Sequence, residues 1–370
     1  MFVSKIFVKF IFLFLILLLC RQSYAGKLTL EKDISDGYLD DYSKIEAAFI
    51  LSGITDSDSL QIYLDWYDQL MEKIKSFDFD INDPVSSAQT VFMYLHSTWL
   101  KTYALESTTL KDIVRKKEFN CVAATILYNI ICEDLNWECE AFETPSHVYT
   151  IFKNFGSNLM VENTSSMGFN IMKNLKAYSR FLAQFYPERD VLRIGLDKLY
   201  YYENSRGRVI NNTELLGLLA YNRAYLAKKN NEFKNAYDYV LLAQQFNRDS
   251  RSNIRFEIGL YYAWGKKLFA DKNFTASFNV FADAYYRYPE NEDFIKNTIA
   301  ALFQGLQLNW QNKEWPKTAE LLDTAQKLEI LSEQNRHTIY QLLNNWKIYS
   351  GKKGDEIALK NVELYLEIFK

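Results

Sequence analysis

The sequence predicts two architectures in one chain: an α+β domain followed by an all-α array of helical hairpins. The chain has 370 residues, enough for about two domains. An apolar helical segment at 121–135 precedes three short runs rich in β-branched and aromatic residues, which is typical of an α+β domain. From residue 213 onward, one pattern of side chains recurs every 41 positions, which indicates stacked helical repeats.

Composition limits the classes of function. Hydrophobic residues make up 48% of the chain, and Pro and Gly are scarce at 5 and 13, so the chain can bury a sizeable core and has little of the composition of disordered linkers. The net charge is −3, which lacks the basic excess that nucleic-acid binding requires. We therefore expect no nucleic-acid partner.

Residues 1–25 have the layout of a cleaved secretory signal. Lys5 and Lys9 form a positively charged start, an unbroken apolar run covers 10–20, and small residues precede a cleavage point after Ala25. The apolar run is shorter than the roughly 20 residues that span a bilayer. We therefore expect an exported protein, periplasmic or secreted, with no stable membrane insertion after signal cleavage.

A lipid anchor on Cys20 is the alternative for this segment. The residue before a lipoprotein cysteine is ordinarily small, and here it is Leu19. This position argues against a lipoprotein.

Residues 26–204 are expected to form the first domain, mainly helical up to residue 118. Apolar side chains recur at helical spacing in 62–74 and 91–100, and Asp83-Pro84 marks a helix start between them. We interpret His96, inside the second of these helices, as a packed or surface histidine rather than a catalytic one. A short helix capped by Thr108 or Thr109 and a polar loop then lead to Cys121.

The helix predicted at 121–135 is followed by strands at 138–142, 147–152 and 157–163. Residues 153–156 are a four-residue connection between the last two strands. If Phe152 and Ser157 close that connection, His147 lies directly opposite Glu162, within hydrogen-bonding reach. The pairing is a commitment to one register, since a slip by one residue reverses every side chain.

Cys121, His147 and Glu162 together predict a catalytic triad. The N-terminus of a helix favours the thiolate of Cys121, and His147 is placed to act as the base. Glu162 would hold the imidazole in one orientation. The Cys121 N–H is one candidate donor to an oxyanion, and Trp99 and Tyr103 are the upstream candidates for the second.

Three cysteines follow the signal segment, and an odd number leaves at least one unpaired. Cys121 and Cys132 are three helical turns apart, about 16 Å, too far for a disulfide. Cys132 and Cys139 therefore either pair or remain two small buried thiols, and the sequence leaves both open. A zinc site built from the three cysteines and His147 lacks the short ligand spacing such sites use, so we expect no metal and no cofactor.

Residues 170–212 are expected to be helical at first and then to bridge to the repeats of the second domain, 205–370. Aromatic, small, apolar and alanine positions recur at offsets of 0, 3, 7 and 10, which is one face of a helix. The three copies are Phe233, Ala236, Val240 and Ala243; Phe274, Ser277, Phe281 and Ala284; and Trp315, Thr318, Leu322 and Ala325. Tyr221, Tyr262 and Phe303 keep the same step on the partner helix.

This pattern resembles tetratricopeptide repeats. Gly265 and Pro289 stand where that family favours Gly and Pro, although the 41-residue period is longer than its usual 34 residues. The resemblance implies an irregular array that recruits a protein or peptide partner.

The residues around the predicted triad resemble the transglutaminase-like superfamily, in particular bacterial members that carry helical repeats. The matching segments are Phe119-Asn120-Cys121, Pro145-Ser146-His147-Val148 and Val161-Glu162-Asn163-Thr164 with Gly168-Phe169, within a region of roughly 40–170. The resemblance implies a papain-like fold with Cys121 as nucleophile, His147 as base and Glu162 as the third member. Many relatives have Asp at the last position; Glu keeps the charge but is one methylene longer.

Two functions of different classes follow. The first is an exported cysteine hydrolase, a thiol protease or amidase, that cleaves amide or isopeptide bonds through a thioester while its repeats recruit a protein partner. The second is a non-catalytic binding scaffold with a degenerate transglutaminase-like domain. An open Cys121 beside His147 favours the enzyme, and a Cys121 covered by aromatic side chains and out of reach of His147 favours the scaffold.

Overall fold

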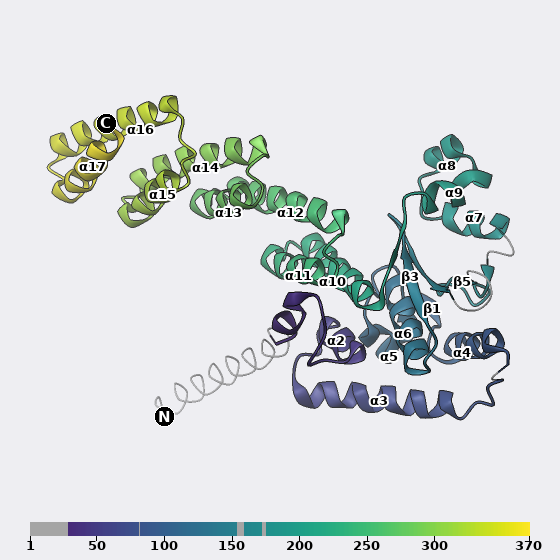
Figure 1. The fold of residues 1–370 in the computed structure, drawn as a ribbon. Helices are drawn as coiled ribbons and strands as arrows, with labels where there is room; N and C mark the ends of the chain where they lie inside the picture. Colours follow the sequence, from purple (N-terminus) through teal and green to yellow (C-terminus); the bar gives the residue numbers. More distant parts are fainter. Residues whose placement is uncertain (1–28, 81, 154–158, 172–174) are drawn as a thin grey trace, which may run out of the picture. The chain divides into compact units, whose positions relative to one another are not determined.

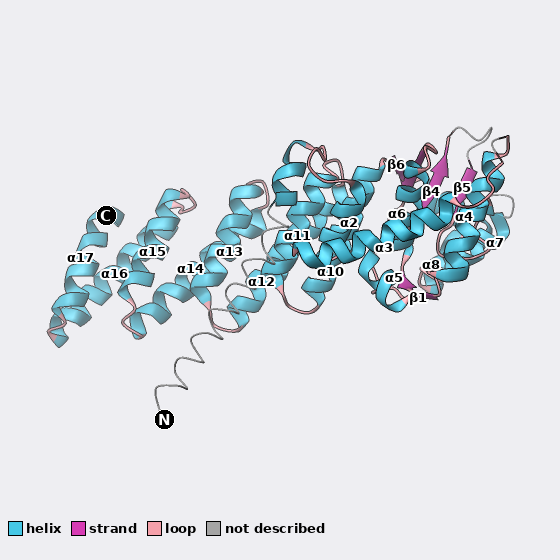
Figure 2. Cartoon of the chain, turned by 90° about the horizontal axis from the view of Figure 1, so that it is seen from below, coloured by secondary structure: helices cyan, strands magenta, loops and turns pink. Residues whose placement is uncertain are grey.

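The computed structural model describes residues 29–80, 82–153, 159–171 and 175–370, and it is mostly helical (Figure 1). The chain divides into two compact units, Met1–Asn253 and Ile254–Lys370. The strands gather in the first unit (Figure 2). The expected signal segment 1–25 and residues 154–156 of the predicted connection lie outside the described residues.

The first unit begins with helices and two short strands that precede the candidate cysteine. In chain order its elements up to the candidate cysteine are η1 (Ile34–Asp36), α2 (Lys44–Leu51), α3 (Ser57–Lys75), α4 (Pro84–Thr98), β1 (Thr102–Tyr103), α5 (Leu110–Lys116) and β2 (Glu118–Phe119). The helix start predicted at Asp83-Pro84 is confirmed, because the Asp83 side chain accepts a hydrogen bond from the Ser86 N–H.

The central helix of this unit is α6 (Cys121–Asp134), close to the predicted 121–135. Its side chains from Val122 to Cys132 are all buried. The helix packs against α2, α10 (Asn212–Lys229) and the strands β3 (Cys139–Glu143) and β4 (Val148–Phe152). A helix buried all round is held by its neighbours, so its first residue is fixed in place relative to the sheet.

The sheet has four antiparallel strands in the order β5-β4-β3-β6, with β5 at Leu159–Val161 and β6 at Arg208–Ile210. Alternate residues of β4 face opposite sides. Thr150 and Phe152 face α6, where Phe152 meets Tyr128 and Thr150 bonds Asn129. Tyr149 faces the other side, in a cluster with Tyr178 of α7. The sheet therefore lies between α6 and the helices that follow β5.

Those helices are α7 (Leu175–Ala183), α8 (Glu188–Ile194), η3 (Leu196–Lys198) and α9 (Leu199–Asn204). They form the helical part of the predicted bridge. The strand β6 that follows them was not predicted, and neither were β1 and β2. Each of the three is only two or three residues long and gains its structure from pairing with another strand, which a local pattern does not record.

The predicted register of the last two strands is wrong by two residues. Thr150 pairs with Val161 and Phe152 with Leu159, so residues 153–158 separate the strands instead of 153–156. His147 is consequently not directly opposite Glu162. A shift of two residues preserves the face of every side chain, however, so the two remain diagonal neighbours on the same side of the sheet.

The repeat pattern is confirmed as an array of helices. Its elements are α11 (Phe233–Phe246), α12 (Arg251–Ala270), α13 (Phe274–Arg287), α14 (Glu292–Gln311), α15 (Trp315–Lys327), α16 (Glu333–Lys353) and α17 (Glu356–Phe369). Phe233, Phe274 and Trp315 each open a helix, and the small, apolar and alanine positions of all three copies are buried. The first copy, α10 and α11, groups with the first unit because α10 packs against α2 and α6.

The same array explains Gly265. A Cβ at this position would lie 2.4 Å from Cζ of Phe281 in the following helix, so the close approach of two helices requires glycine. A left-handed residue also recurs with the repeat, since Asn231, Lys272 and Lys313 all have positive φ two residues before the next helix.

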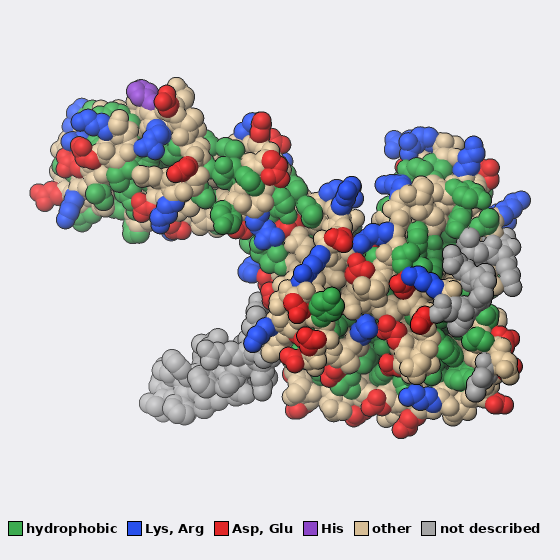
Figure 3. Space-filling view, in the orientation of Figure 1, with side chains coloured by type: hydrophobic (Ala, Val, Ile, Leu, Met, Phe, Trp, Pro, Cys, Tyr) green, Lys and Arg blue, Asp and Glu red, His purple; other side chains and the backbone are tan. Residues whose placement is uncertain are grey.

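The exposed face in Figure 3 carries interspersed acidic and basic side chains on each unit. Among the described residues, no helix combines the length and apolar character needed to cross a bilayer.

Candidate active site

Cys121 opens α6, and its position is set by the residue before it. The Asn120 side chain accepts a hydrogen bond from the Ala123 N–H at 3.1 Å and donates one to the Leu105 carbonyl at 3.1 Å. This cap leaves the Cys121 N–H among the first N–H groups of the helix, which have no partner within it. Cys121 is half-buried. The positive end of the helix macrodipole favours a negative charge on its sulfur.

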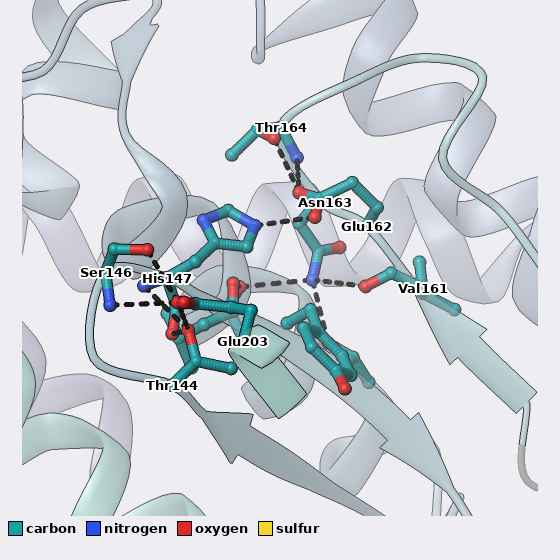
Figure 4. A network of polar contacts seen from close by, with 12 residues as sticks. Thr144, Ser146, His147, Val161, Glu162, Asn163, Thr164 and Glu203 are labelled. Atoms are coloured by element: carbon teal, nitrogen blue, oxygen red, sulfur yellow. Dashed lines mark hydrogen bonds and ion pairs between the residues drawn. The ribbon is translucent and has the colours of Figure 1, made fainter. Parts of the chain in front are cut away.

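His147 precedes β4 and points to the side of the sheet that carries Glu162. Its Nε2 lies 2.6 Å from Oε2 of Glu162, and both side chains are fully enclosed (Figure 4). The contact between these two predicted residues is thus confirmed, although the pairing that led to it was wrong. A 2.6 Å contact between a ring nitrogen and a carboxylate is a short, charge-assisted hydrogen bond.

The second ring nitrogen of His147 is available to the thiol. Nδ1 is buried and makes no hydrogen bond of ordinary geometry among the described residues. The Cys121 thiol nevertheless lies close enough to influence the titration of the ring. With Nε2 committed to Glu162, only Nδ1 can face Cys121. Loose contacts of this kind are common in catalytic sites without substrate.

The charge of Glu162 controls the protonation of His147. Burial by itself would lower the pKa of the imidazole, but the negative charge of Glu162, its hydrogen bond and the nearby Cys121 thiol outweigh burial and raise the pKa to about 10. The site therefore favours an imidazolium at neutral pH, which is the partner that a thiolate needs.

Glu162 is itself held on its second oxygen. The Thr164 N–H donates to Oε1 at 3.0 Å, and the Thr164 hydroxyl donates to the same oxygen. The Glu162 N–H donates to the Gly168 carbonyl at 3.0 Å. These contacts fix the acid at the end of β5 and orient it toward His147, so the longer side chain is accommodated within a closed turn.

Aromatic rings surround the pair. Phe185, just after α7, stacks on His147 with ring centroids 5.5 Å apart, and Phe181 meets it edge-on at 5.6 Å. Phe185 also contacts Tyr103 of β1 at 6.3 Å. The segment predicted only as a bridge thus supplies one wall of the site.

Tyr103 is the upstream candidate whose hydroxyl interacts electrostatically with Cys121. Burial raises the pKa of its hydroxyl, and the charges of Cys121 and Glu162 raise it further, so this hydroxyl is within electrostatic range of both and stays protonated. Trp99 instead packs against Trp66 at 4.9 Å. Of the two predicted candidates, Tyr103 has the better position for a second oxyanion donor.

His96 is packed, as interpreted from the sequence. Its ring lies 4.5 Å from that of Phe92. Burial lowers the pKa of His96 to about 4, against the raising influence of the Asn163 backbone and the Glu162 charge. A neutral imidazole among rings supports the core beside Glu162.

Glu203 of α9 belongs to the same network and was missed. It is fully buried and accepts hydrogen bonds from Thr144 and Ser146, in the turn that carries His147 (Figure 4). The local signal was a single acid after the run Leu199-Tyr-Tyr-Tyr, since a carboxylate in an apolar helix is buried only with partners.

The other two cysteines are free and buried. The Cys139 thiol donates to the Asn129 carbonyl at 3.6 Å, and burial raises the pKa of Cys132. We predict that in the reduced, folded protein only Cys121 is alkylated rapidly, whereas denaturant exposes all three thiols. Peptide mass spectrometry after a timed iodoacetamide pulse measures this, with Cys121→Ala as the control that removes the fast thiol. Rapid labelling of Cys132 or Cys139 in the folded state contradicts the burial.

A cleft of about 1110 Å³ lies at the other end of α6, lined by residues that include Ile130, Glu133 and Trp137. Cys121 is at the N-terminal end of the same helix, about 20 Å away at 1.5 Å per residue. The size of this cleft therefore says nothing about the candidate site. Among the described residues, no cluster of three or more His, Cys, Asp or Glu side chains is suited to hold a metal ion.

The chain matches no known protein-family model and no curated protein sequence. A crystal structure of menin, whose title describes the binding site for the Mixed Lineage Leukemia protein, is similar over 93% of this chain and 91% of that one, at 9% identity and a TM-score of 0.31. At that level of similarity the comparison carries no inference about this protein.

Proposed function

We propose that the protein is an exported cysteine hydrolase with a transglutaminase-like, papain-like domain, and that Cys121, His147 and Glu162 cleave an amide or isopeptide bond. One observation carries the proposal: the buried 2.6 Å contact of His147 with Glu162, beside a half-buried thiol at a helix N-terminus. The order of the three residues and their placement at the start of a helix and at the ends of two antiparallel strands support the same family. The export rests on the layout of residues 1–25.

In the proposed reaction the Cys121 thiolate attacks the carbonyl carbon, and the charge moves to the carbonyl oxygen. The Cys121 N–H and the Tyr103 hydroxyl donate to that oxygen. The His147 imidazolium then protonates the leaving amine, so the C–N bond breaks and a thioester forms. Water, or an amine in the acyl-transfer variant, attacks the thioester, gives its proton to His147 and releases Cys121.

Glu162 remains ionised throughout this cycle and stabilises the imidazolium form. The helical repeats would recruit the protein that carries the scissile bond. Their exposed aromatic and apolar side chains, such as Tyr286 and Ile357, support a protein or peptide partner.

The alternative is a non-catalytic scaffold. It is favoured by Phe185, which stacks on His147 and reaches across to Tyr103. In that case the aromatic wall is permanent packing, and binding through the repeats is the function.

The test is the pH dependence of Cys121 alkylation by iodoacetamide, followed at the Cys121 peptide in the wild type and in His147→Ala. We expect rapid reaction that persists well below pH 7 in the wild type and is about 100-fold slower at pH 6 in the variant. His337→Ala, which removes an exposed histidine of the second unit, is the matched control and should react like the wild type. A wild-type alkylation rate that rises only near pH 8.5 would refute the catalytic triad and favour the non-catalytic scaffold.

A further inference from the structure

The turn that carries His147 is fastened to a carboxylate outside the triad. Residues 144–147 join β3 to β4, and the Thr144 N–H donates to the His147 carbonyl at 2.8 Å. Oε1 of Glu203 accepts from the Thr144 hydroxyl at 2.6 Å, the Ser146 hydroxyl at 2.6 Å and the Ser146 N–H at 3.2 Å (Figure 4). Three donors of this turn thus bind to one oxygen of the buried Glu203.

The Thr144 hydroxyl links this contact to the backbone of His147. The Thr144 hydroxyl has one proton and lies 2.6 Å from Glu203 and 3.0 Å from the His147 carbonyl. The shorter contact takes the proton. The hydroxyl oxygen is then the acceptor for the His147 N–H, at 3.0 Å. A continuous chain therefore runs from the backbone of His147 through Thr144 to Glu203.

We propose that Glu203 is a positioning residue, which sets the location of the His147 imidazole by holding its turn. The inference deepens the proposed hydrolase site and rests on it for its catalytic meaning. Glu203 touches neither the ring nor the thiol, and its contacts are with the backbone and hydroxyls of the turn. It acts through geometry: the short His147–Glu162 contact depends on where the turn places the ring.

The choice of a carboxylate follows from the number of donors. Three hydrogen bonds converge on Oε1 of the buried Glu203, and a carboxyl oxygen accepts them without offering a competing donor to the turn. Its place on α9 also ties the helices that wall the site to the residue they cover, since Phe185 stacks on the same imidazole.

The experiment uses the protein labelled with ¹⁵N-histidine. The chain has only 3 histidines, so ring signals are few, and His147→Ala assigns the relevant one. In Glu203→Ala we expect the titration midpoint of the His147 ring to fall by about one pH unit, because a looser contact with Glu162 lets burial dominate. Glu203→Gln keeps an acceptor oxygen, so its midpoint should fall by less than that of Glu203→Ala. Alkylation of Cys121 at pH 6 should slow by about tenfold in Glu203→Ala.

Two further variants keep the test decisive if Glu203→Ala folds poorly. Ser146→Ala removes one donor from an exposed residue and should lower the titration midpoint of the His147 ring as well. Added to Glu203→Ala, it should lower the midpoint no further. Glu257→Gln is the matched control: Glu257 is also fully buried, bonds Arg287 and Tyr288 in the second unit, and should leave the His147 ring unchanged.

The outcomes separate the two proposals. Unchanged His147 titration in Glu203→Gln and Ser146→Ala overturns the positioning role, whatever Cys121 does. If the variants lower the titration midpoint of the His147 ring but wild-type Cys121 reacts only near pH 8.5, the positioning role is supported and the hydrolase is refuted.

Discussion

Glu162→Gln is expected to slow the alkylation of Cys121 at pH 6 by about 100-fold. The raised pKa of His147 depends on the charge of Glu162, because burial of the imidazole acts in the opposite direction. Without that charge the ring becomes neutral at pH 6, and the thiolate loses its cationic partner. The pH profile of iodoacetamide labelling at the Cys121 peptide measures the change.

Glu162→Asp is the informative comparison. It keeps the charge but shortens the side chain by one methylene, so the 2.6 Å contact with His147 should lengthen without disappearing. We expect a loss of about tenfold, smaller than that of Glu162→Gln. Equal rates for wild type and Glu162→Gln at pH 6 would show that Glu162 does not govern the site.

Glu162→Gln should also change how the stability of the fold depends on pH. A histidine whose folded-state pKa is raised stabilises the fold fully below its usual value of 6.5, and this contribution is lost as pH rises toward about 10. In Glu162→Gln, burial dominates and lowers the pKa, so the neutral ring should cost stability as pH falls below 6.5. Urea unfolding at pH 5 and pH 9 should therefore show opposite trends for the two proteins.

The repeats were predictable because their signal is local and periodic. Helix faces follow from spacing within a turn, and three copies at the same step show that the faces must stack. The structure accordingly places Phe233, Phe274 and Trp315 at the first position of successive helices. The start of α6 was predictable for a similar reason, since Asn120 before an apolar run is a strong helix cap.

The meeting of His147 and Glu162 was predicted for a reason that was only half right. The face of a strand residue depends on parity, which the sequence records, whereas the register depends on the length and path of the connection. The error of two residues left the parity intact. An error of one residue would have placed the acid on the α6 side of the sheet, where Asn163 now bonds Thr125.

Glu203 and Phe185 could not be assigned to the site from the sequence. Both lie between β5 and β6, Phe185 just after α7 and Glu203 in α9, and their partners are 38 to 59 residues away along the chain. Nothing in the local pattern specifies which strand turn such a helix will cover. Their positions follow from the packing of Tyr178 and Leu199 against Tyr149 on the outer face of the sheet.

Gly168→Ala is expected to cause the largest loss of stability among these substitutions, about 3–5 kcal/mol. A Cβ at this position would lie 1.9 Å from the Glu162 carbonyl oxygen and 2.8 Å from the Glu162 Cβ. The backbone has little room to move, because the Gly168 carbonyl accepts the Glu162 N–H and the Gly168 N–H donates to the Ser165 carbonyl at 2.8 Å. Urea unfolding measures the loss.

Relief of this clash must displace the acid, so the same variant should also lose the fast reaction of Cys121 at pH 6 even where it remains folded. Gly351→Ala is the matched control: a Cβ there meets nothing within 4 Å, on an exposed position of α16, and alanine should stabilise the helix by up to about 1 kcal/mol. If both glycine variants unfold at the same urea concentration, the turn around Gly168 can accommodate a Cβ and does not hold Glu162 rigidly. The acid would then lack the rigid support that a catalytic triad needs.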